Sequence, residues 1–116
     1  MNLEQFYKIV GSDYKEIIDR LGGNELLVIK FLNKFRLDNS FNELKNKLNE
    51  NDTNEAFRMA HSLKGICANL GIQSLFVKAS NVTELLRSGN INDAKKEFPD
   101  LEKEYNNVIN LLIELN

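Results

Sequence analysis

The chain has 116 residues, of which 42% are hydrophobic, and its 15 basic and 17 acidic residues give a net charge of −2. This length and composition are typical of one ordinary domain with a modest core, so we expect a single domain over residues 1–116. The near balance of charge gives no indication of nucleic acid or an anionic membrane as a partner. One cysteine excludes an internal disulfide, and with a single histidine it cannot build a zinc site.

Targeting and membrane segments are not expected from this sequence. Residues 1–5 include a charged side chain and lack the apolar run of a signal peptide. No stretch approaches the roughly 20 apolar residues of a membrane-spanning helix. We therefore expect a cytoplasmic protein that does not contact a membrane.

Helical periods run through the chain, and no segment shows the alternation of a strand. In chain order, the first four expected elements are a short turn or helix over residues 3–10 and helices over residues 13–21, 24–37 and 39–49. Asp13 and Asn24 can cap the second and third of them, and the pair Gly22-Gly23 ends the second. The third and fourth carry apolar residues at spacings of three and four, as amphipathic helices do.

The fifth expected helix covers residues 52–71. Asp52 and Glu55 have the spacing of a capping box, with the aspartate in the cap position. Gly71 is suited to end the helix. These signals place the only histidine of the chain, His61, in the middle of a helix.

Two further helices are expected, over residues 73–87 and from about residue 92 to the end, with a turn at 88–90. The only proline, Pro99, should either kink the last helix or mark the first turn of a new segment, because an interior proline removes a backbone hydrogen bond. The pattern predicts an all-α fold, an antiparallel four-helix bundle with one or two short leading helices.

The helix with His61 has two different faces. At about 100° per residue, positions 61, 64, 65 and 68 share one face. The apolar residues gather on the opposite face: Ala56, Met59, Leu63, Ile66, Cys67 and Leu70. We therefore expect His61 to face water, and an unperturbed imidazole, with a pKa of about 6.5, is largely neutral near neutral pH and able to attack phosphorus. Cys67 is expected to be a small buried hydrophobic residue.

Two neighbours of His61 fit a histidine that receives a phosphoryl group. Lys64, one turn on, can offset part of the roughly −1.5 to −2 charge of such a group. Gly65 leaves the adjacent surface open, and because a glycine inside a helix costs about 0.5–1 kcal/mol relative to alanine, it indicates close approach by another protein. The ordinary alternatives are an exposed lysine without function and a glycine at which two helices pack closely.

A docking surface is expected around His61. Phe57, one turn before the histidine, is either a partly exposed anchor for a partner or a residue packed on a neighbouring helix. Ala60, Ala68 and Asn69 are expected to border this surface.

The stretch Ala60-His61-Ser62-Leu63-Lys64-Gly65-Ile66-Cys67-Ala68-Asn69-Leu70-Gly71 resembles the signature helix of histidine-containing phosphotransfer (HPt) domains. Residues 21–27 and 82–86 lie where such domains carry comparable segments, so the resemblance covers most of the chain. The end of the motif is similar to the form found in stand-alone and hybrid-kinase phosphotransfer domains. Ile72 follows it, where the chemotaxis-kinase form tends to have an aromatic residue.

The resemblance implies that His61 is the phosphoacceptor, that Lys64 compensates charge and that Gly65 gives clearance. It further implies a phosphorelay carrier in two-component signalling, which accepts a phosphoryl group from the aspartate of one response-regulator receiver domain and passes it to another. A hybrid histidine kinase would then be a further partner. A monomer is the simplest expectation for the oligomeric state.

The sequence has no Gly-x-x-x-x-Gly-Lys-Ser/Thr loop and no strand-helix alternation to hold ATP. We therefore expect no cofactor, no metal site and no kinase activity of its own, and whether this phosphotransfer intermediate counts as an enzyme stays open. Two alternatives remain: a non-catalytic bundle that docks a receiver or kinase, and a purely structural bundle. The variant His61→Gln distinguishes the carrier from both alternatives, because the carrier would lose transfer whereas a docking or structural bundle would keep its role.

Overall fold

The computed structural model describes residues 1–115, and within that range it contains helices and no strand. In chain order, the helices are α1 (Leu3–Val10), α2 (Tyr14–Arg20), α3 (Glu25–Arg36), α4 (Ser40–Asn49), α5 (Thr53–Leu70), α6 (Gln73–Arg87) and α7 (Ile91–Ile113). The all-α prediction is confirmed, and the observed boundaries lie within one or two residues of the expected ones, except that α7 ends at Ile113 and was expected to reach the end of the chain. Differences of that size are usual at helix ends.

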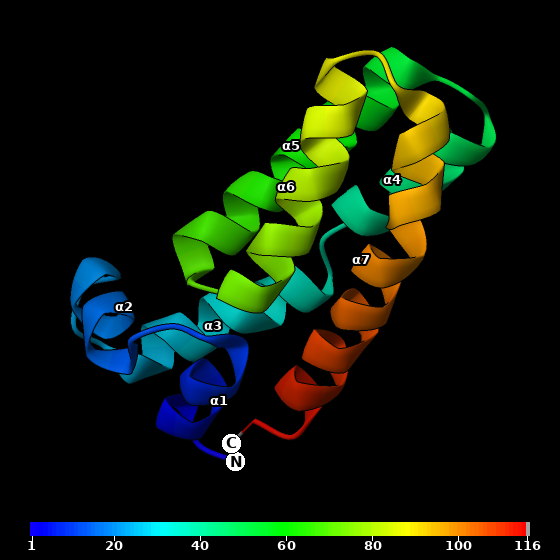
Figure 1. Ribbon diagram of the computed structural model, residues 1–116. Coiled ribbons are helices and arrows are strands. Elements are labelled where there is room, and N and C mark those ends of the chain that lie inside the picture. Colours follow the sequence, from blue (N-terminus) through cyan, green and yellow to red (C-terminus); the bar gives the residue numbers. More distant parts are fainter. Residues whose placement is uncertain (116) are drawn as a thin grey trace.

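The four helices α4 to α7 form an elongated bundle, and α1, α2 and α3 gather at one end of it (Figure 1). Short connections at residues 50–52, 71–72 and 88–90 join consecutive bundle helices, so each helix runs antiparallel to the one before it. The predicted four-helix bundle is therefore confirmed. Its short leading helices are α1 and α2, and α3 is a third, longer one that lies across the end of the bundle (Figure 1).

The core lies between the bundle helices, where each contributes one apolar stripe. Its fully buried members from the bundle include Leu44, Leu63, Cys67, Leu75, Ala79, Val82, Leu101 and Val108. An aromatic cluster joins α4 to α7, in which the ring of Phe41 stacks on Phe98 at 5.4 Å and on Tyr105 at 3.9 Å between ring centroids. These contacts fix α4 and α7 against each other, which leaves α5 supported between α4 and α6.

Pro99 lies inside α7, so it does not mark the start of a new segment. The buried side chains of Phe98 and Leu101 lie on either side of it in the sequence. Their packing holds both parts of the helix against the bundle and offsets the missing backbone hydrogen bond. At the end of the same helix, the side chain of Ile113 is 58% exposed.

The predicted helix caps form. The side chains of Asp13, Asn24 and Asp52 each accept a hydrogen bond from a backbone N–H in the first turn of α2, α3 and α5. The capping box of α5 is only half complete, because the carboxylate of Glu55 pairs with Arg58 at 2.9 Å. The start of the histidine-bearing helix is thus fixed at Asp52 by a single side-chain bond.

The carboxyl end of α5 is capped by side chains from residues 7–20. These donate to the final carbonyls of the helix and its cap: Tyr7 to Leu70 (2.8 Å), Ser12 to Gly71, and Arg20 to Ala68 (2.9 Å) and Asn69 (3.1 Å). The last four carbonyls of a helix lack intrahelical partners, and a cation there is favoured by the helix dipole. The leading segment therefore completes α5, and we call these bonds the carbonyl cap.

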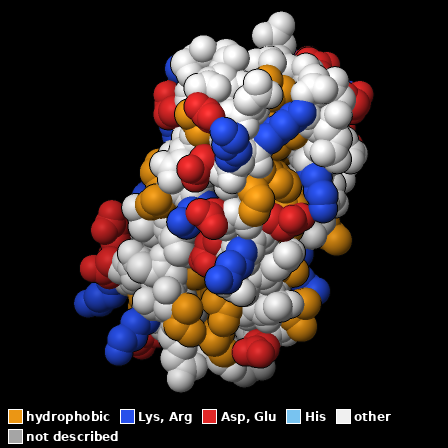
Figure 2. Space-filling view, turned by 45° about the vertical axis from the view of Figure 1, so that its right-hand side comes forward, with side chains coloured by type: hydrophobic (Ala, Val, Ile, Leu, Met, Phe, Trp, Pro, Cys, Tyr) orange, Lys and Arg blue, Asp and Glu red, His pale blue; other side chains and the backbone are white. Residues whose placement is uncertain are grey.

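The surface carries both signs of charge. Figure 2 shows Lys and Arg side chains interspersed with Asp and Glu on one face of the molecule, with apolar side chains between them. On this face the two signs of charge are not segregated, which agrees with the net charge of −2. Within residues 1–115, no helix is both long and apolar enough to cross a membrane.

Candidate functional site

His61 is exposed on α5, as expected from the helical period. The opposite side of the helix is buried in the bundle: Ala56, Ala60, Leu63, Cys67 and Leu70. Met59 and Ile66, which were also assigned to the apolar side, are half-buried. The imidazole therefore meets solvent while its helix is anchored from behind.

The ring of His61 stacks on Phe57, one turn earlier, with 5.7 Å between ring centroids and 29° between ring planes. Phe57 is half-buried and packs against the core, so the packing role expected as one alternative is present. Its ring also lies 4.9 Å from the guanidinium carbon of Arg87 on α6, a cation–π distance. Phe57 thus connects the histidine to a cation of the neighbouring helix.

Lys64 leans towards α6. Its ammonium lies 3.4 Å from one carboxylate oxygen of Glu84 and 6.0 Å from the ring centroid of Phe76. The other oxygen of Glu84 accepts a hydrogen bond from Nε of Arg87 at 3.1 Å. One carboxylate therefore bridges Lys64 on α5 and Arg87 on α6.

The pKa of Glu84 is lowered, mainly by the hydrogen bond from Arg87 and further by Lys64. Glu84 is therefore ionised throughout the pH range in which an imidazole is neutral. We call this group the histidine patch: Phe57, His61, Lys64 and Gly65 on α5 with Glu84 and Arg87 on α6.

Gly65 is exposed, and a Cβ added to it would meet no heavy atom within 4 Å. The alternative that this glycine allows two helices to pack closely is therefore wrong. The space beside it is open to solvent, next to His61. Ala68 and Asn69 are also exposed on α5.

Ala60 does not belong to the exposed surface, which corrects its predicted place in the docking surface. It is fully buried, because at about 100° per residue it points away from His61 and towards the bundle, with Ala56 and Leu63. Cys67 is also fully buried, and burial together with the charge of Asp38 raises the pKa of its thiol to about 12. This agrees with its expected role as a small hydrophobic residue.

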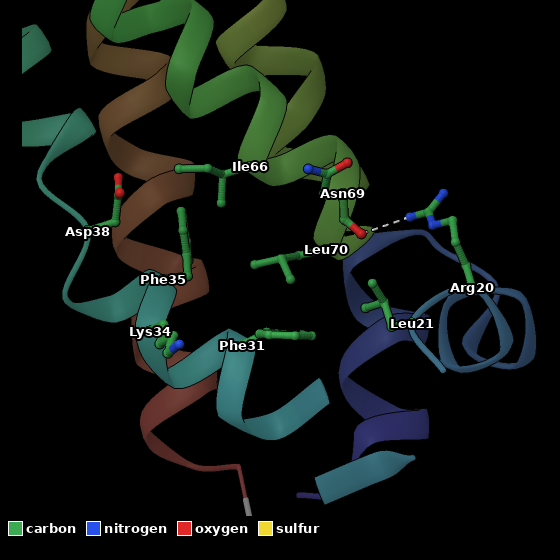
Figure 3. A pocket seen from close by; sticks show the side chains of 9 residues that line it. All are labelled: Arg20, Leu21, Phe31, Lys34, Phe35, Asp38, Ile66, Asn69 and Leu70. Carbon is green, nitrogen blue, oxygen red and sulfur yellow. Dashed lines mark hydrogen bonds between the residues drawn. The ribbon is translucent and has the colours of Figure 1, made fainter. Parts of the chain in front are cut away.

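An apolar groove of about 550 Å³ lies on another side of α5, between that helix and the leading helices α2 and α3 (Figure 3). Its lining consists of Arg20, Leu21, Phe31, Lys34, Phe35, Asp38, Ile66, Asn69 and Leu70. Figure 3 also shows Arg20 of the carbonyl cap bonded to the carbonyl of Asn69. The groove was not predicted. The apolar spacing of the third helix indicates one amphipathic stripe, but within that helix Phe35 is buried and Phe31 is only half-buried.

Comparison with family models matches residues 35–111 to the Hpt domain, which is more than half of the chain. The chain belongs to the Hpt domain family. The matched residues contain all of α4, α5 and α6 and most of α7, and with them the whole histidine patch. Searches among curated proteins and among solved structures found no match.

Membership of the Hpt family gives the protein a histidine-phosphotransfer role in the phosphorelays of two-component signalling. Hpt domains interact with the receiver domains of response regulators. His61 is the only histidine of this Hpt domain, and it lies within the matched residues.

Sequence reasoning missed two members of the histidine patch, Glu84 and Arg87. Their spacing of three residues on one helix predicts an ion pair, and this pair is present. That spacing does not tell which neighbouring helix the pair faces. Only the packing of α6 against α5 brings Glu84 to Lys64.

Proposed function

We propose that this Hpt domain carries a phosphoryl group on His61 between two receiver domains. The observation that carries the proposal is that the only histidine of the chain is exposed in the middle of the matched residues, with Lys64 three residues further along the same helix. An exposed, neutral imidazole is a competent nucleophile for phosphorus.

The transfer reaction needs little from this protein beyond a positioned ring. A lone pair on a ring nitrogen of His61 forms a P–N bond while the P–O bond to the aspartate of the donor receiver breaks. The aspartate leaves as a carboxylate, and the proton on the other ring nitrogen can pass to solvent because the ring is exposed. Passage to a second receiver is the same reaction in reverse, with a different aspartate.

Phe57, Lys64 and Arg87 each have a role in this proposal. The stack on Phe57 restricts the rotation of the imidazole, so that the ring loses less rotational entropy on reaching the transition state. Lys64 and Arg87 can pair with phosphoryl oxygens and offset their charge. These groups support a carrier that has a prepared site for the phosphoryl group.

The docking surface proposed for the receiver surrounds the histidine. The open space beside Gly65 lets the receiver bring its aspartate close to the ring. Exposed Ala68 and Asn69 and the half-buried ring of Phe57 provide contact area on the same helix. The ending Asn69-Leu70-Gly71 resembles that of phosphotransfer domains of hybrid kinases, so we propose a hybrid histidine kinase as the source of the donor receiver, acting on a monomer.

The proposal is tested by mixing the protein with phosphorylated receiver domains and measuring intact mass before and after brief acid treatment. We expect a mass increase of one phosphoryl group that is acid-labile and absent from His61→Gln. Ser62→Ala is the matched control, because it removes the exposed hydroxyl next to the histidine. An acid-stable label that persists in His61→Gln, or no label from any receiver, would contradict the proposal and favour a docking module.

A further inference from the structure

Glu84 is the one anionic member of the histidine patch. Its two carboxylate oxygens are divided between two cations, with Oε1 at 3.4 Å from Nζ of Lys64 and Oε2 at 3.1 Å from Nε of Arg87. Arg87 belongs to the same helix as Glu84, whereas Lys64 lies on α5. The carboxylate therefore links the two helices directly beside the histidine.

Both cations are positioned relative to His61 by separate contacts. Lys64 follows the histidine by three residues on the same helix, the spacing at which side chains are neighbours. Arg87 lies over the ring of Phe57, and that ring stacks on the imidazole. Lys64 is therefore a helical neighbour of a phosphoryl group on His61, and Arg87 lies on the ring that stacks against the imidazole. Glu84 already pairs with both cations.

Phosphorylation would place two anions in competition for these cations. A phosphoryl group brings about −1.5 to −2 charges near neutral pH, and Glu84 brings one more. The low pKa of Glu84 means that protonation does not remove this competition at neutral pH. Ion pairs with the phosphoryl group would have to share each cation with Glu84, and this sharing weakens the attraction that either anion receives.

We propose that Glu84 destabilises phosphorylated His61, by competing with the phosphoryl group for Lys64 and Arg87 and by repelling it. Glu84 thereby shifts the transfer equilibrium from phosphorylated His61 towards the receiver, so that the phosphoryl group does not accumulate on the carrier. This inference rests on the proposed function of His61. Glu84 is a positioning residue for the two cations and takes no part in bond making.

The effect should be modest because the site is open to water. Lys64 is 26% exposed and Glu84 55% exposed at the side chain, so solvent and salt screen their interaction. Glu84 and a phosphoryl group on His61 would interact across solvent over about two side-chain lengths. Removing the single charge of Glu84 should therefore change the transfer equilibrium constant about three- to fivefold. A change of this size is measurable in a transfer equilibrium.

The first experiment measures the equilibrium between a phosphorylated receiver and this Hpt domain, at concentrations where the complex is scarce. In Glu84→Gln we expect the equilibrium to move about three- to fivefold towards phosphorylated His61. The matched control is Glu102→Gln, which makes the same charge change and breaks an ion pair with Lys45 (2.8 Å) between α4 and α7. It should leave the equilibrium unchanged.

A second readout needs no receiver. The protein is phosphorylated with phosphoramidate, a small phosphoryl donor, and the pKa of the phosphoryl group is followed by ³¹P NMR. Glu84→Gln should lower this pKa, since removing a nearby anion favours the dianion, and a Lys64→Ala background should reduce the difference. An unchanged phosphoryl pKa, or an equilibrium that is unchanged or moves towards the receiver, would overturn the role of Glu84. Failure of wild-type protein to be labelled by any receiver would instead count against the proposed function.

Discussion

The leading segment and the bundle contact α5 in different ways. The bundle helix α6 contacts the middle of α5 through side chains of the histidine patch. These contacts are an ion pair and a cation–π contact, so they depend on the residue type at each position. The leading segment meets the end of α5 through backbone carbonyls, which every residue type offers. Under the proposed function, side chains within residues 35–111, the family-matched region, specify the chemistry, whereas the leading segment completes the helix that carries them.

The comparison predicts that substitutions in the histidine patch change transfer and spare stability, and that substitutions at the carbonyl cap do the opposite. The largest effect is expected for Gly65→Gln. Its long side chain would occupy the open space beside His61 and displace the partner's aspartate, slowing transfer about a hundredfold. The measurement is the rate of label transfer from a phosphorylated receiver.

Gly65→Ala is the control for this change. Its Cβ meets no neighbour, and loss of the glycine should stabilise the helix by about 0.5–1 kcal/mol in urea unfolding. A normal transfer rate in Gly65→Gln would show that the glycine gives no clearance.

The next effect is expected at the carbonyl cap. Gly71 has φ of +72°, and a Cβ added to it would overlap the side chain of Ile17 on α2. Gly71→Ala should therefore lower the free energy of unfolding by about 2–3 kcal/mol, through backbone strain and overpacking together. Urea unfolding measures this loss, and transfer per folded molecule should stay at the wild-type rate.

Gly89→Ala separates the two causes in that prediction. Gly89 also has a positive φ, +78°, but an added Cβ there has open space. Its cost should be about 1 kcal/mol, from backbone strain alone. Equal losses in the two variants would mean that the overlap of the added Cβ with Ile17 on α2 adds nothing to the cost of Gly71→Ala.

The smallest effect is expected for Lys64→Ala. One of two cations near the phosphoryl group is lost, and because the site is exposed, transfer should slow by only about three- to tenfold. The free energy of unfolding should change by less than about 0.5 kcal/mol, as for most surface substitutions. Lys45→Ala, which removes the cation of the surface pair with Glu102, is the matched control for both measurements. Unchanged transfer kinetics would make Lys64 a bystander.

Much of the fold follows from local signals in the sequence. The caps at Asp13, Asn24 and Asp52 and the stop at Gly71 depend on residues next to one another in the chain, so they could be predicted. The exposure of His61 followed from helical period alone. Ala60 was misplaced because a residue adjacent to His61 was assigned by proximity in sequence rather than by its angle around the helix.

The remaining features depend on contacts between distant segments. Tyr7 bonds to Leu70 and Lys64 to Glu84 across 63 and 20 residues of sequence, and nothing local in the chain specifies these pairs. Pro99 continues a helix because its buried neighbours are held by α4 and the rest of the bundle. Each of these features depends on which helices pack against each other, and the hydrophobic periodicity of a segment does not specify its packing partner.

The central claim, that His61 both accepts and gives up a phosphoryl group, is tested most directly by a relay between two receivers. A phosphorylated receiver is mixed with an unphosphorylated second receiver that it does not label by itself, with and without this Hpt domain, and label on each protein is followed in time. The account predicts that label reaches the second receiver only through wild-type protein, with a transient acid-labile species that His61→Gln cannot form. Equal passage with His61→Gln, or label that remains on His61 and never moves on, would contradict it.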